Sequence, residues 1–334
     1  MIMTTTSPKK PAALGLTSGG LDSMLAAIVL QQQGIRVEWL CLETPFFSAD
    51  KSRQAAEQLG IPITVRDITA EYLPMLKNPP CGYGQHMNPC LDCHGLMANI
   101  AGRIMAEQGF DFIFSGEVVG QRPMSQTKPS LRYVEKQSGI EGYLLRPLSA
   151  RLLPETIPEQ TGLVDRDRLL DFSGRSRKAQ MTLAEEHHLR DYPSPGGGCL
   201  LTDKSFSLRL RDLFDHQEDC GRGDLALLRY GRHFRLSEKT RLIVGRTRED
   251  NQQLEEYAPT GPVLYLKARD YPGPTCLLIG QPNEGEFMLA AGISVGYGKA
   301  PDDKPAAVTI KGKEGKNGVS MMGIPPGRLE HLRI

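Results

Sequence analysis

The sequence has no long apolar segment and no marked excess of charge of either sign. Its longest apolar stretches are far shorter than the roughly 20 residues that cross a bilayer, and residues 1–10 lack the apolar core of a signal peptide. We therefore expect a cytoplasmic protein without a membrane partner. The net charge of +1 neither favours nor excludes a polyanionic partner, because a local basic patch can be hidden in a neutral sum.

Aromatic residues are also scarce, at 6% of the chain, and no internal repeat is visible. This scarcity does not exclude a globular protein, because 40% of the residues are hydrophobic and can form a sizeable core. The length of 334 residues favours two domains of ordinary size. Seven cysteines in a chain without an export signal do not predict a disulfide framework, and reduced thiols held for metal binding or catalysis fit better.

Apolar runs alternate with helical patterns in the first half of the chain. We expect strands at 12–17, 36–43, 63–68, 112–115 and 143–148, and helices at 21–33, 49–59 and 90–108. This alternation predicts an α/β fold with a doubly wound parallel sheet. Ligands of such sheets bind at the carboxyl ends of the strands. Three polar segments, 17–23, 115–126 and 147–151, follow strand ends, so we expect the site there.

The pattern changes in two places. The segment 74–90 is rich in proline and glycine and is too long for a mere connection, so we expect a functional or disordered loop. After about residue 203, shorter β-like runs follow at 225–230, 241–244, 263–267 and 275–279. We therefore predict a disordered tail over 1–11, a first domain over 12–203 and a smaller α+β domain over 204–334. The end of the chain, 301–334, shows no clear pattern.

A glycine loop joins the first predicted strand to the first predicted helix. It reads Ser18-Gly19-Gly20-Leu21-Asp22-Ser23. The glycines leave backbone N–H groups open and the helix N-terminus adds a partial positive charge, which together favour a phosphate or pyrophosphate. The serines could donate hydrogen bonds to it, and Asp22 could cap the helix or help to hold Mg²⁺. Because no Gly-Lys-Ser/Thr is present, this is not the loop of NTPases that cleave the terminal phosphate.

The loop resembles that of the PP-loop ATP pyrophosphatase superfamily, whose members cut ATP between the α and β phosphates and transfer AMP. This resemblance implies an adenylating enzyme that binds ATP and Mg²⁺. The nucleotide-binding residues would be Ser18, Gly19, Gly20, Asp22 and Ser23, with Asp22 also catalytic. The alternative is a tight Gly-Gly turn capped by serine and aspartate.

Three cysteines occur in settings that suit metal binding or sulfur chemistry. Cys90 and Cys93 form a CxxC pair at the start of a predicted helix, where the pKa of a thiol is lowered and the thiolate is favoured. Cys199 follows the glycines 196–198, which let the backbone approach a ligand closely. Three cysteine ligands would leave one iron of a cubane cluster open. The remaining cysteines Cys41, Cys220 and Cys276 are expected to be structural.

A structural zinc site is the alternative for these cysteines. Zinc in such a site takes four protein ligands. The fourth ligand could be Cys81 or His94, which lie close to the CxxC pair in the sequence.

Four motifs in the same order resemble the PP-loop tRNA uridine sulfurtransferases, both the 2-thiouridylases and the 4-thiouridine synthetases. They are SGGLDS at 18–23, GYG at 82–84 with NPCLDCH at 88–94, FSGEVVGQRPMSQ at 114–126 and GGGCLLTD at 196–203. The resemblance covers about residues 12–203. It implies that ATP adenylates a uridine carbonyl oxygen of tRNA with release of pyrophosphate, and that sulfur then replaces this oxygen. It also implies a sulfur donor, either sulfide or a cysteine desulfurase.

Family members with three cysteines hold sulfur on a 4Fe–4S cluster or pass it through a persulfide and a disulfide. By resemblance, the cluster ligands here would be Cys90, Cys93 and Cys199, and the persulfide route would use Cys90 and Cys199. Near the transferring phosphoryl group, Arg122 and Arg146 could stabilise charge, or each could be a surface ion-pair partner. Glu117 and Gln121 are weaker candidates for contacts with the substrate or the nucleotide.

The second domain contains a basic segment, 228–251, that resembles the small RNA-binding domain of ribosome-quality-control proteins of the NFACT type. Its basic residues would suit phosphate contacts. They are Arg229, Arg232, His233, Arg235, Lys239, Arg241, Arg246 and Arg248. The alternative is the solvated charged surface of an ordinary α+β domain.

Two other functions compete with tRNA thiolation. One is a small-molecule adenylating synthase of the same superfamily with zinc-binding cysteines, such as the deazaguanine nitrile-forming enzyme. In that enzyme the cysteines cluster in the sequence, whereas Cys199 lies far from Cys93 here. The other is a non-catalytic RNA-binding adaptor with a vestigial nucleotide site. The intact loop, with both serines and the aspartate, speaks against it.

Overall fold

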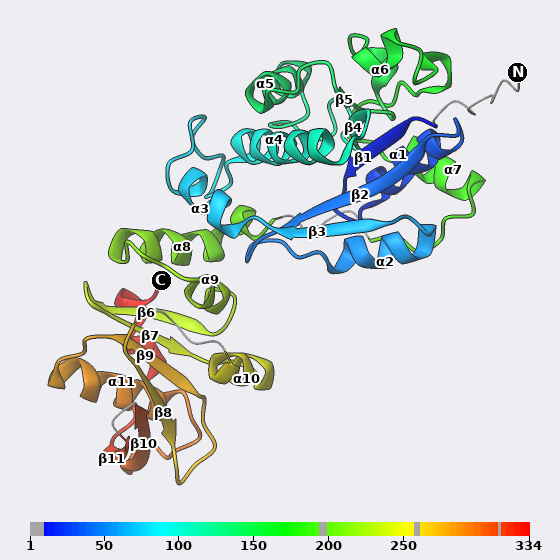
Figure 1. Ribbon diagram of the computed structural model, residues 1–334. Helices are drawn as coiled ribbons and strands as arrows, with labels where there is room; N and C mark the ends of the chain where they lie inside the picture. Colours follow the sequence, from blue (N-terminus) through cyan, green and yellow to red (C-terminus); the bar gives the residue numbers. More distant parts are fainter. Residues whose placement is uncertain (1–9, 194–198, 257–260, 313–314) are drawn as a thin grey trace, which may run out of the picture. The chain divides into compact units, whose positions relative to one another are not determined.

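The structure is a computed structural model that describes residues 10–193, 199–256, 261–312 and 315–334 (Figure 1). The predicted tail over 1–11 lies almost entirely outside the described residues, and so do the glycines 196–198 of the fourth motif. The chain divides into two compact units, Met1–Cys199 and Leu200–Ile334. Among the described residues, no helix combines the length and the apolar character that a membrane span requires.

The first unit contains a five-stranded sheet in the order β3-β2-β1-β4-β5, with every pair of strands parallel. The strands are β1 (Ala12–Leu16), β2 (Arg36–Glu43), β3 (Ile63–Asp67), β4 (Phe112–Ser115) and β5 (Leu144–Leu145). The chain moves outward from β1 through β2 to β3 and then returns to the other side of β1 for β4. The carboxyl ends of β1 and β4 are therefore the switch point at which such sheets bind ligands. The predicted doubly wound fold is confirmed.

Seven α-helices are described in the first unit. They are α1 (Leu21–Gln31), α2 (Asp50–Leu59), α3 (Thr69–Lys77), α4 (Cys90–Gln108), α5 (Lys128–Ser138), α6 (Ile157–Gln160) and α7 (Lys178–Glu186). Gly60 and Gly109 end α2 and α4 in the left-handed conformation, as expected of glycine C-caps. The predicted loop over 74–90 is partly wrong, because α3 continues to Lys77 with Pro74 inside the helix.

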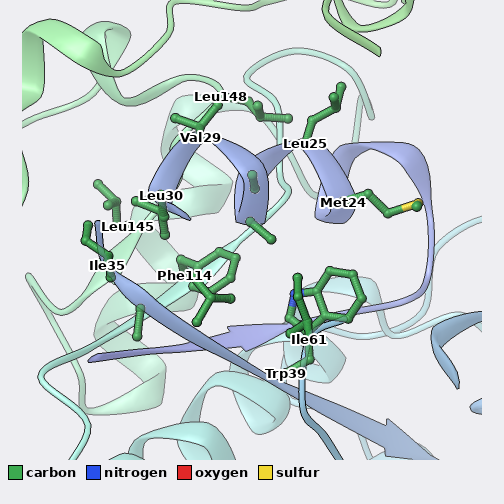
Figure 2. Packing of buried hydrophobic residues seen from close by; sticks show 14 of the residues in the cluster. Met24, Leu25, Val29, Leu30, Ile35, Trp39, Ile61, Phe114, Leu145 and Leu148 are labelled. Atoms are coloured by element: carbon green, nitrogen blue, oxygen red, sulfur yellow. The ribbon is translucent and has the colours of Figure 1, made fainter. Parts of the chain in front are cut away.

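The core of the first unit lies between α1 and the sheet (Figure 2). Trp39 of β2 and Phe114 of β4 are fully buried there, and each such side chain contributes on the order of 1.5–3 kcal/mol by leaving water. A Cβ on Gly15 of β1 would lie 2.3 Å from the Phe114 ring and 2.7 Å from the Trp39 ring. Glycine at this position lets both rings pack over β1, which fixes the strand that leads into the glycine loop.

The second unit contains a six-stranded antiparallel sheet in the order β11-β10-β8-β9-β7-β6. The strands are β6 (Arg232–Ser237), β7 (Thr240–Val244), β8 (Val263–Ala268), β9 (Cys276–Gly280), β10 (Ala306–Gly312) and β11 (Gly315–Met321). The helices are α8 (Lys204–His216), α9 (Arg222–Leu227), α10 (Arg248–Glu256) and α11 (Glu284–Gly296). Residues of α11 are buried in the same apolar cluster as those of the sheet, which confirms a second α+β unit.

One prediction in the second unit is wrong. The apolar run 225–230 is not a strand, because α9 begins at Arg222 and the Asp224 carboxylate accepts a hydrogen bond from the Gly221 N–H at 2.9 Å. This carboxylate caps the first turn of the helix and so favours helix over strand. The end 301–334, which had no clear pattern, contains the hairpin pair β10 and β11.

Candidate active site

The glycine loop joins β1 to α1 and has little room for side chains. Gly19 adopts a φ of 69°, and its N–H donates to Thr17 Oγ1 at 3.1 Å. A Cβ on Gly19 would lie 2.3 Å from the backbone of Lys51 in the first turn of α2. Glycine is therefore required at position 19 both by the backbone conformation and by the contact with α2.

No side chain among the described residues caps the N-terminus of α1, which begins after Gly20. The expectation that Asp22 might cap this helix is not met. The N–H groups of the first turn of an uncapped helix remain available, and they favour an anion. Ser18 is exposed beside them, whereas Ser23 is buried and donates its hydroxyl to the Gly20 carbonyl at 2.8 Å. Ser23 therefore supports the turn itself.

One oxygen of the Asp22 carboxylate accepts a hydrogen bond, and the other has no partner among the described residues. Its Oδ2 accepts from Gln121 Nε2 at 2.8 Å, and Gln121 Oε1 in turn accepts from Gln180 Nε2 at 3.2 Å. Asp22 Oδ1 is buried and has no hydrogen-bond partner among the described residues. A buried, unpartnered carboxylate oxygen is costly, and it suits Mg²⁺, which prefers oxygen ligands and often binds through one or two carboxylates and phosphates. The residues therefore fit a magnesium nucleotide.

The segment after β4 approaches the glycine loop directly. A Cβ on Gly116 would lie 2.5 Å from the backbone of Asp22 and Ser23, so only glycine permits this contact. The segment 147–151 contacts the segment after β4 through Ser149, whose hydroxyl accepts a hydrogen bond from the Val119 N–H at 3.0 Å. The three segments that follow strand ends are thus brought together, as the sequence indicated.

A buried ion-pair network occupies the strand end beside the loop. Arg146 is 2% exposed, donates to Glu117 Oε2 at 2.9 Å and forms a second ion pair with Glu135. His94 of α4 hydrogen-bonds Glu117 Oε1 through Nδ1 at 2.9 Å. Burial alone would raise the pKa of Glu117, but Arg146 and His94 hold it down to about 2. Arg146 is therefore an ion-pair partner in the interior, whereas Arg122 is exposed on the turn after β4.

A cavity of about 410 Å³ opens beside Gly19. Its lining includes two cationic side chains, Lys51 of α2 and Arg190, together with Tyr192. The sequence analysis missed these residues, because no motif surrounds them and only the fold brings them to the loop. Two cations against the single carboxylate of Asp191 leave the lining positive, which suits the phosphates of a nucleotide at the loop.

The three cysteines Cys90, Cys93 and Cys199 are called the cysteine trio below, and both Cys90 and Cys199 lie within electrostatic range of Cys93. The pKa of Cys93 is raised to about 12, mainly by burial and also by the charges of Cys199 and Cys90, while Tyr72 lowers it. The predicted lowering of the pKa at this helix start is therefore wrong for Cys93, because desolvation outweighs the partial charge of the helix N-terminus. Asn88 donates its Nδ2 to Cys90 Sγ at 3.3 Å.

The donor chemistry of the cysteine trio fits a metal centre, since thiolates bind zinc and iron–sulfur clusters. Within the described part of the chain, however, no three His, Cys, Asp or Glu side chains stand ready to hold a metal ion. The two candidates for a fourth ligand have other partners. Cys81 Sγ lies 2.9 Å from Tyr133 Oη, and His94 is bonded to Glu117 through Nδ1. The contact with Tyr133 engages Cys81, whereas the bond of His94 to a carboxylate leaves its Nε2 open, as in zinc-ligating histidines, so a zinc site with His94 as the fourth ligand stays the alternative.

Residues 9–151 match the family model described as thiamine biosynthesis protein (ThiI), and residues 231–331 match that of the NFACT protein RNA binding domain. The first match includes β1, the glycine loop and Cys90 with Cys93, and it ends at Arg151. Residues 9–151 of the first unit are therefore similar to the ThiI family and are called the ThiI-like domain below.

Curated relatives match about two fifths of this chain. A tRNA sulfurtransferase of Desulfurococcus amylolyticus is 31% identical over 147 residues, which are 41% of this chain and 29% of that protein. A tRNA-specific 2-thiouridylase MnmA of Trichlorobacter lovleyi is 28% identical over 151 residues, 42% of this chain and 43% of that protein. The chain thus spans 29–43% of the length of the curated relatives that it matches. A solved 4-thiouridine synthetase–RNA complex with bound ATP is 19% identical, with 53% of each chain covered and a TM-score of 0.34.

The NFACT-type domain presents fewer basic residues than the sequence predicted. Arg241 and His233 are 3% and 1% exposed, so the expectation that they contact phosphates is wrong. Arg241 lies in β7, where burial lowers its pKa to about 10 although Asp224 lies 3.9 Å away. Arg235 is ion-paired with Asp212. The exposed basic residues of the segment are Arg229, Lys239, Arg246 and Arg248.

Proposed function

We propose that this chain is an ATP-dependent tRNA sulfurtransferase that adenylates a uridine carbonyl oxygen and then replaces it with sulfur. One observation supports this most: a ThiI-like PP-loop with an open helix N-terminus and an unpartnered Asp22 oxygen lies in the same unit as the cysteine trio. The first feature suits a magnesium nucleotide and the second suits sulfur chemistry. An adenylating enzyme without sulfur transfer would use such thiols only to hold a structural zinc ion.

In the adenylation step, the uridine oxygen attacks the α-phosphorus of ATP and the bond from that phosphorus to the pyrophosphate oxygen breaks. The backbone N–H groups at Gly19, Gly20 and the start of α1 would hold the phosphates. Asp22 would bind Mg²⁺ through its free oxygen, with Gln121 fixing the orientation of the carboxylate. Lys51 and Arg190 in the cavity would add positive charge for the departing pyrophosphate.

Other predicted residues take supporting parts in this proposal. Ser18 is exposed at the loop and can donate to a phosphate, whereas Ser23 stabilises the turn. Glu117 and Arg146 form the buried pair that fixes the end of β4 beside the loop. Arg122, exposed on the following turn, is the arginine that remains available for a phosphate or for RNA.

In the sulfur step, a sulfur atom attacks the adenylated carbon and AMP leaves with the original oxygen. A 4Fe–4S cluster held by the cysteine trio would supply a position at which this sulfur is kept for transfer. Without a cluster, Cys90 and Cys199 would carry the sulfur as a persulfide and end as a disulfide. Sulfide or a cysteine desulfurase would supply the sulfur.

The NFACT-type domain would bind the tRNA through its exposed arginines and lysine. Phosphate contacts of this kind give affinity without reading the sequence. We therefore assign the substrate as tRNA on the combination of this domain with the ThiI-like domain.

Pyrophosphate release, measured with and without tRNA, tests the proposal. We expect release that requires tRNA, together with thiolated uridine in the tRNA nucleosides analysed by mass spectrometry. Release that needs only a small molecule would instead indicate the small-molecule synthase. Tight tRNA binding without any release would indicate the RNA-binding adaptor.

A further inference from the structure

Two segments of the first unit, 118–134 and 172–184, contain no acidic residue and meet each other through their backbones. The Gly174 N–H donates to the Val119 carbonyl at 2.8 Å, and a Cβ on Gly120 would lie 3.4 Å from the Gly174 nitrogen. The basic residues of both segments are therefore brought to one surface, called the basic edge below. They are Arg122, Lys128, Arg132, Arg175, Arg177 and Lys178, of which Arg177 is half-buried and the others are exposed.

Hydrogen bonds fix the basic edge beside the nucleotide site. Gln121, which precedes Arg122, donates to Asp22 Oδ2 at 2.8 Å. Gln180 is buried in the first turn of α7 and donates its Nε2 to Gln121 Oε1 at 3.2 Å. The helix α7 also packs against α1, the helix that begins at the glycine loop (Figure 1). The start of α7 is thus held two side-chain hydrogen bonds away from the Asp22 carboxylate.

The charges of the basic edge are placed where they do not stabilise the fold. Lys128 is the first residue of α5 and Lys178 is the first residue of α7, and neither first turn contains an acidic residue. A cation at a helix start is unfavourable, because the helix N-terminus carries a partial positive charge.

The basic edge also lacks internal partners. Among the described residues none of its six side chains forms an ion pair, whereas Arg151 and Arg166 of the same unit are paired with Asp171 and Glu159. The Nε of Arg177 is buried and has no hydrogen-bond partner there. Cations that contribute neither to helix ends nor to ion pairs indicate an anionic ligand from outside the chain.

We propose that the basic edge binds phosphates of the tRNA backbone and thereby holds the RNA with a uridine facing the Asp22 site. This inference rests on the proposed function. An RNA strand carries its phosphates in a row, which suits cations distributed along a surface better than the compact phosphates of ATP do. The cavity beside Gly19 already offers Lys51 and Arg190 to the nucleotide. Contacts with backbone phosphates fix the position of an RNA without reading its bases.

The experiment compares Lys178→Glu with Lys136→Glu in the full chain. Lys136 is the matched control, because it is an exposed lysine in the last turn of α5, where the helix end favours a cation. Binding of unfractionated tRNA is titrated at several salt concentrations, and binding of ATP with Mg²⁺ is measured without tRNA. Thermal unfolding is measured without either ligand. The double variant Arg175→Glu with Lys178→Glu extends the series.

We expect Lys178→Glu to bind tRNA about fivefold or more weakly at ~0.1 M salt and to lose about one unit of salt slope, with about two units lost in the double variant. ATP binding should be unchanged. The Tm of Lys178→Glu should rise by roughly 1–3 °C, because an acid replaces a cation at a helix start. Lys136→Glu should keep its tRNA affinity within about twofold and lose a similar amount of Tm.

Three results would overturn the inference. One is equal tRNA affinity in Lys178→Glu and Lys136→Glu. Another is a loss of ATP affinity in Lys178→Glu as large as its loss of tRNA affinity, which would assign the charges to the phosphates of the nucleotide. The third is a lower Tm in Lys178→Glu, which would show that Lys178 serves the fold.

The same proteins separate this inference from the proposed function. If the parent binds tRNA and releases pyrophosphate with it and Lys178→Glu does so equally, only the basic edge fails. If tRNA binding depends on Lys178 but the parent releases no pyrophosphate, the basic edge stands as an RNA surface and the proposed reaction fails.

Discussion

Replacing Asp22 with alanine is the sharpest test of the nucleotide site. The change removes one hydrogen bond, from Gln121 at 2.8 Å, and one buried oxygen that has no partner. The lost bond costs about 1 kcal/mol and the removed unpartnered oxygen returns about 1–3 kcal/mol, so the free energy of unfolding should stay the same or rise by up to about 2 kcal/mol. Catalysis should suffer, because the carboxylate that would bind Mg²⁺ is gone.

The expected catalytic loss is at least about 10²-fold in kcat for pyrophosphate release, comparable to removing one preorganised group that stabilises transition-state charge. Asp111→Ala is the matched control at the opposite end of β1. Its carboxylate accepts from the Ala12 N–H at 2.7 Å, so this variant should lose roughly 2–4 °C of Tm and keep its kcat. Tm and tRNA-dependent pyrophosphate release are measured on both proteins. Full turnover in Asp22→Ala would refute the assignment of the loop.

Three further predictions concern the second unit, the ion-pair network and the thiols. Reversing Arg246 and Arg248 to glutamate should weaken tRNA binding and flatten its salt dependence by about one unit of slope per lost phosphate contact. The slope is measured by titration of the protein with tRNA at several salt concentrations. Unchanged slopes would show that these two arginines do not contact the RNA. Glu117→Gln should lower the free energy of unfolding at pH 7 by on the order of 3 kcal/mol, because the pKa of Glu117 is held down to about 2 in the folded protein. In denaturant titrations the difference between the variant and the parent should shrink as the pH falls from about 4.5 toward 2. A difference that does not depend on pH would contradict the cause. Alanine at any member of the cysteine trio should abolish thiolation and lower bound iron and sulfide from about four each per chain, while ATP binding is kept. Cys41→Ala and Cys81→Ala should keep both thiolation and the bound iron and sulfide. Tightly bound zinc with full activity in air would rule out the cluster.

The parallel sheet and most of its helices could be predicted because local signals and packing agree. Apolar runs of strand length mark β1 and β2, and glycines mark the ends of α2 and α4. The glycine loop could be placed for the same reason, since its motif lies between a strand and a helix. The helix α3 could not, because Pro74 inside it is a local signal against helix that tertiary packing overrides.

The chemistry of single side chains was less predictable, because it depends on burial. Arg241 looked like a surface arginine in a basic segment, yet β7 is buried along its whole length. Cys93 was expected to ionise easily at a helix start, but its surroundings raise its pKa to about 12. Lys51 and Arg190 are far apart in the sequence and meet only at the cavity beside Gly19. Desolvation and long-range proximity leave no pattern in one sequence.

The hydrogen bond between His94 and Glu117 links the two chemical ends of the first unit. His94 belongs to the same helix as Cys90 and Cys93, while Glu117 follows directly on Gly116, which touches the backbone of Asp22. A shift of α4 along its axis would therefore pull on the strand end that supports the nucleotide loop. One hydrogen bond thus couples the position of the CxxC pair to that of the glycine loop, although the two motifs lie about 70 residues apart in the sequence.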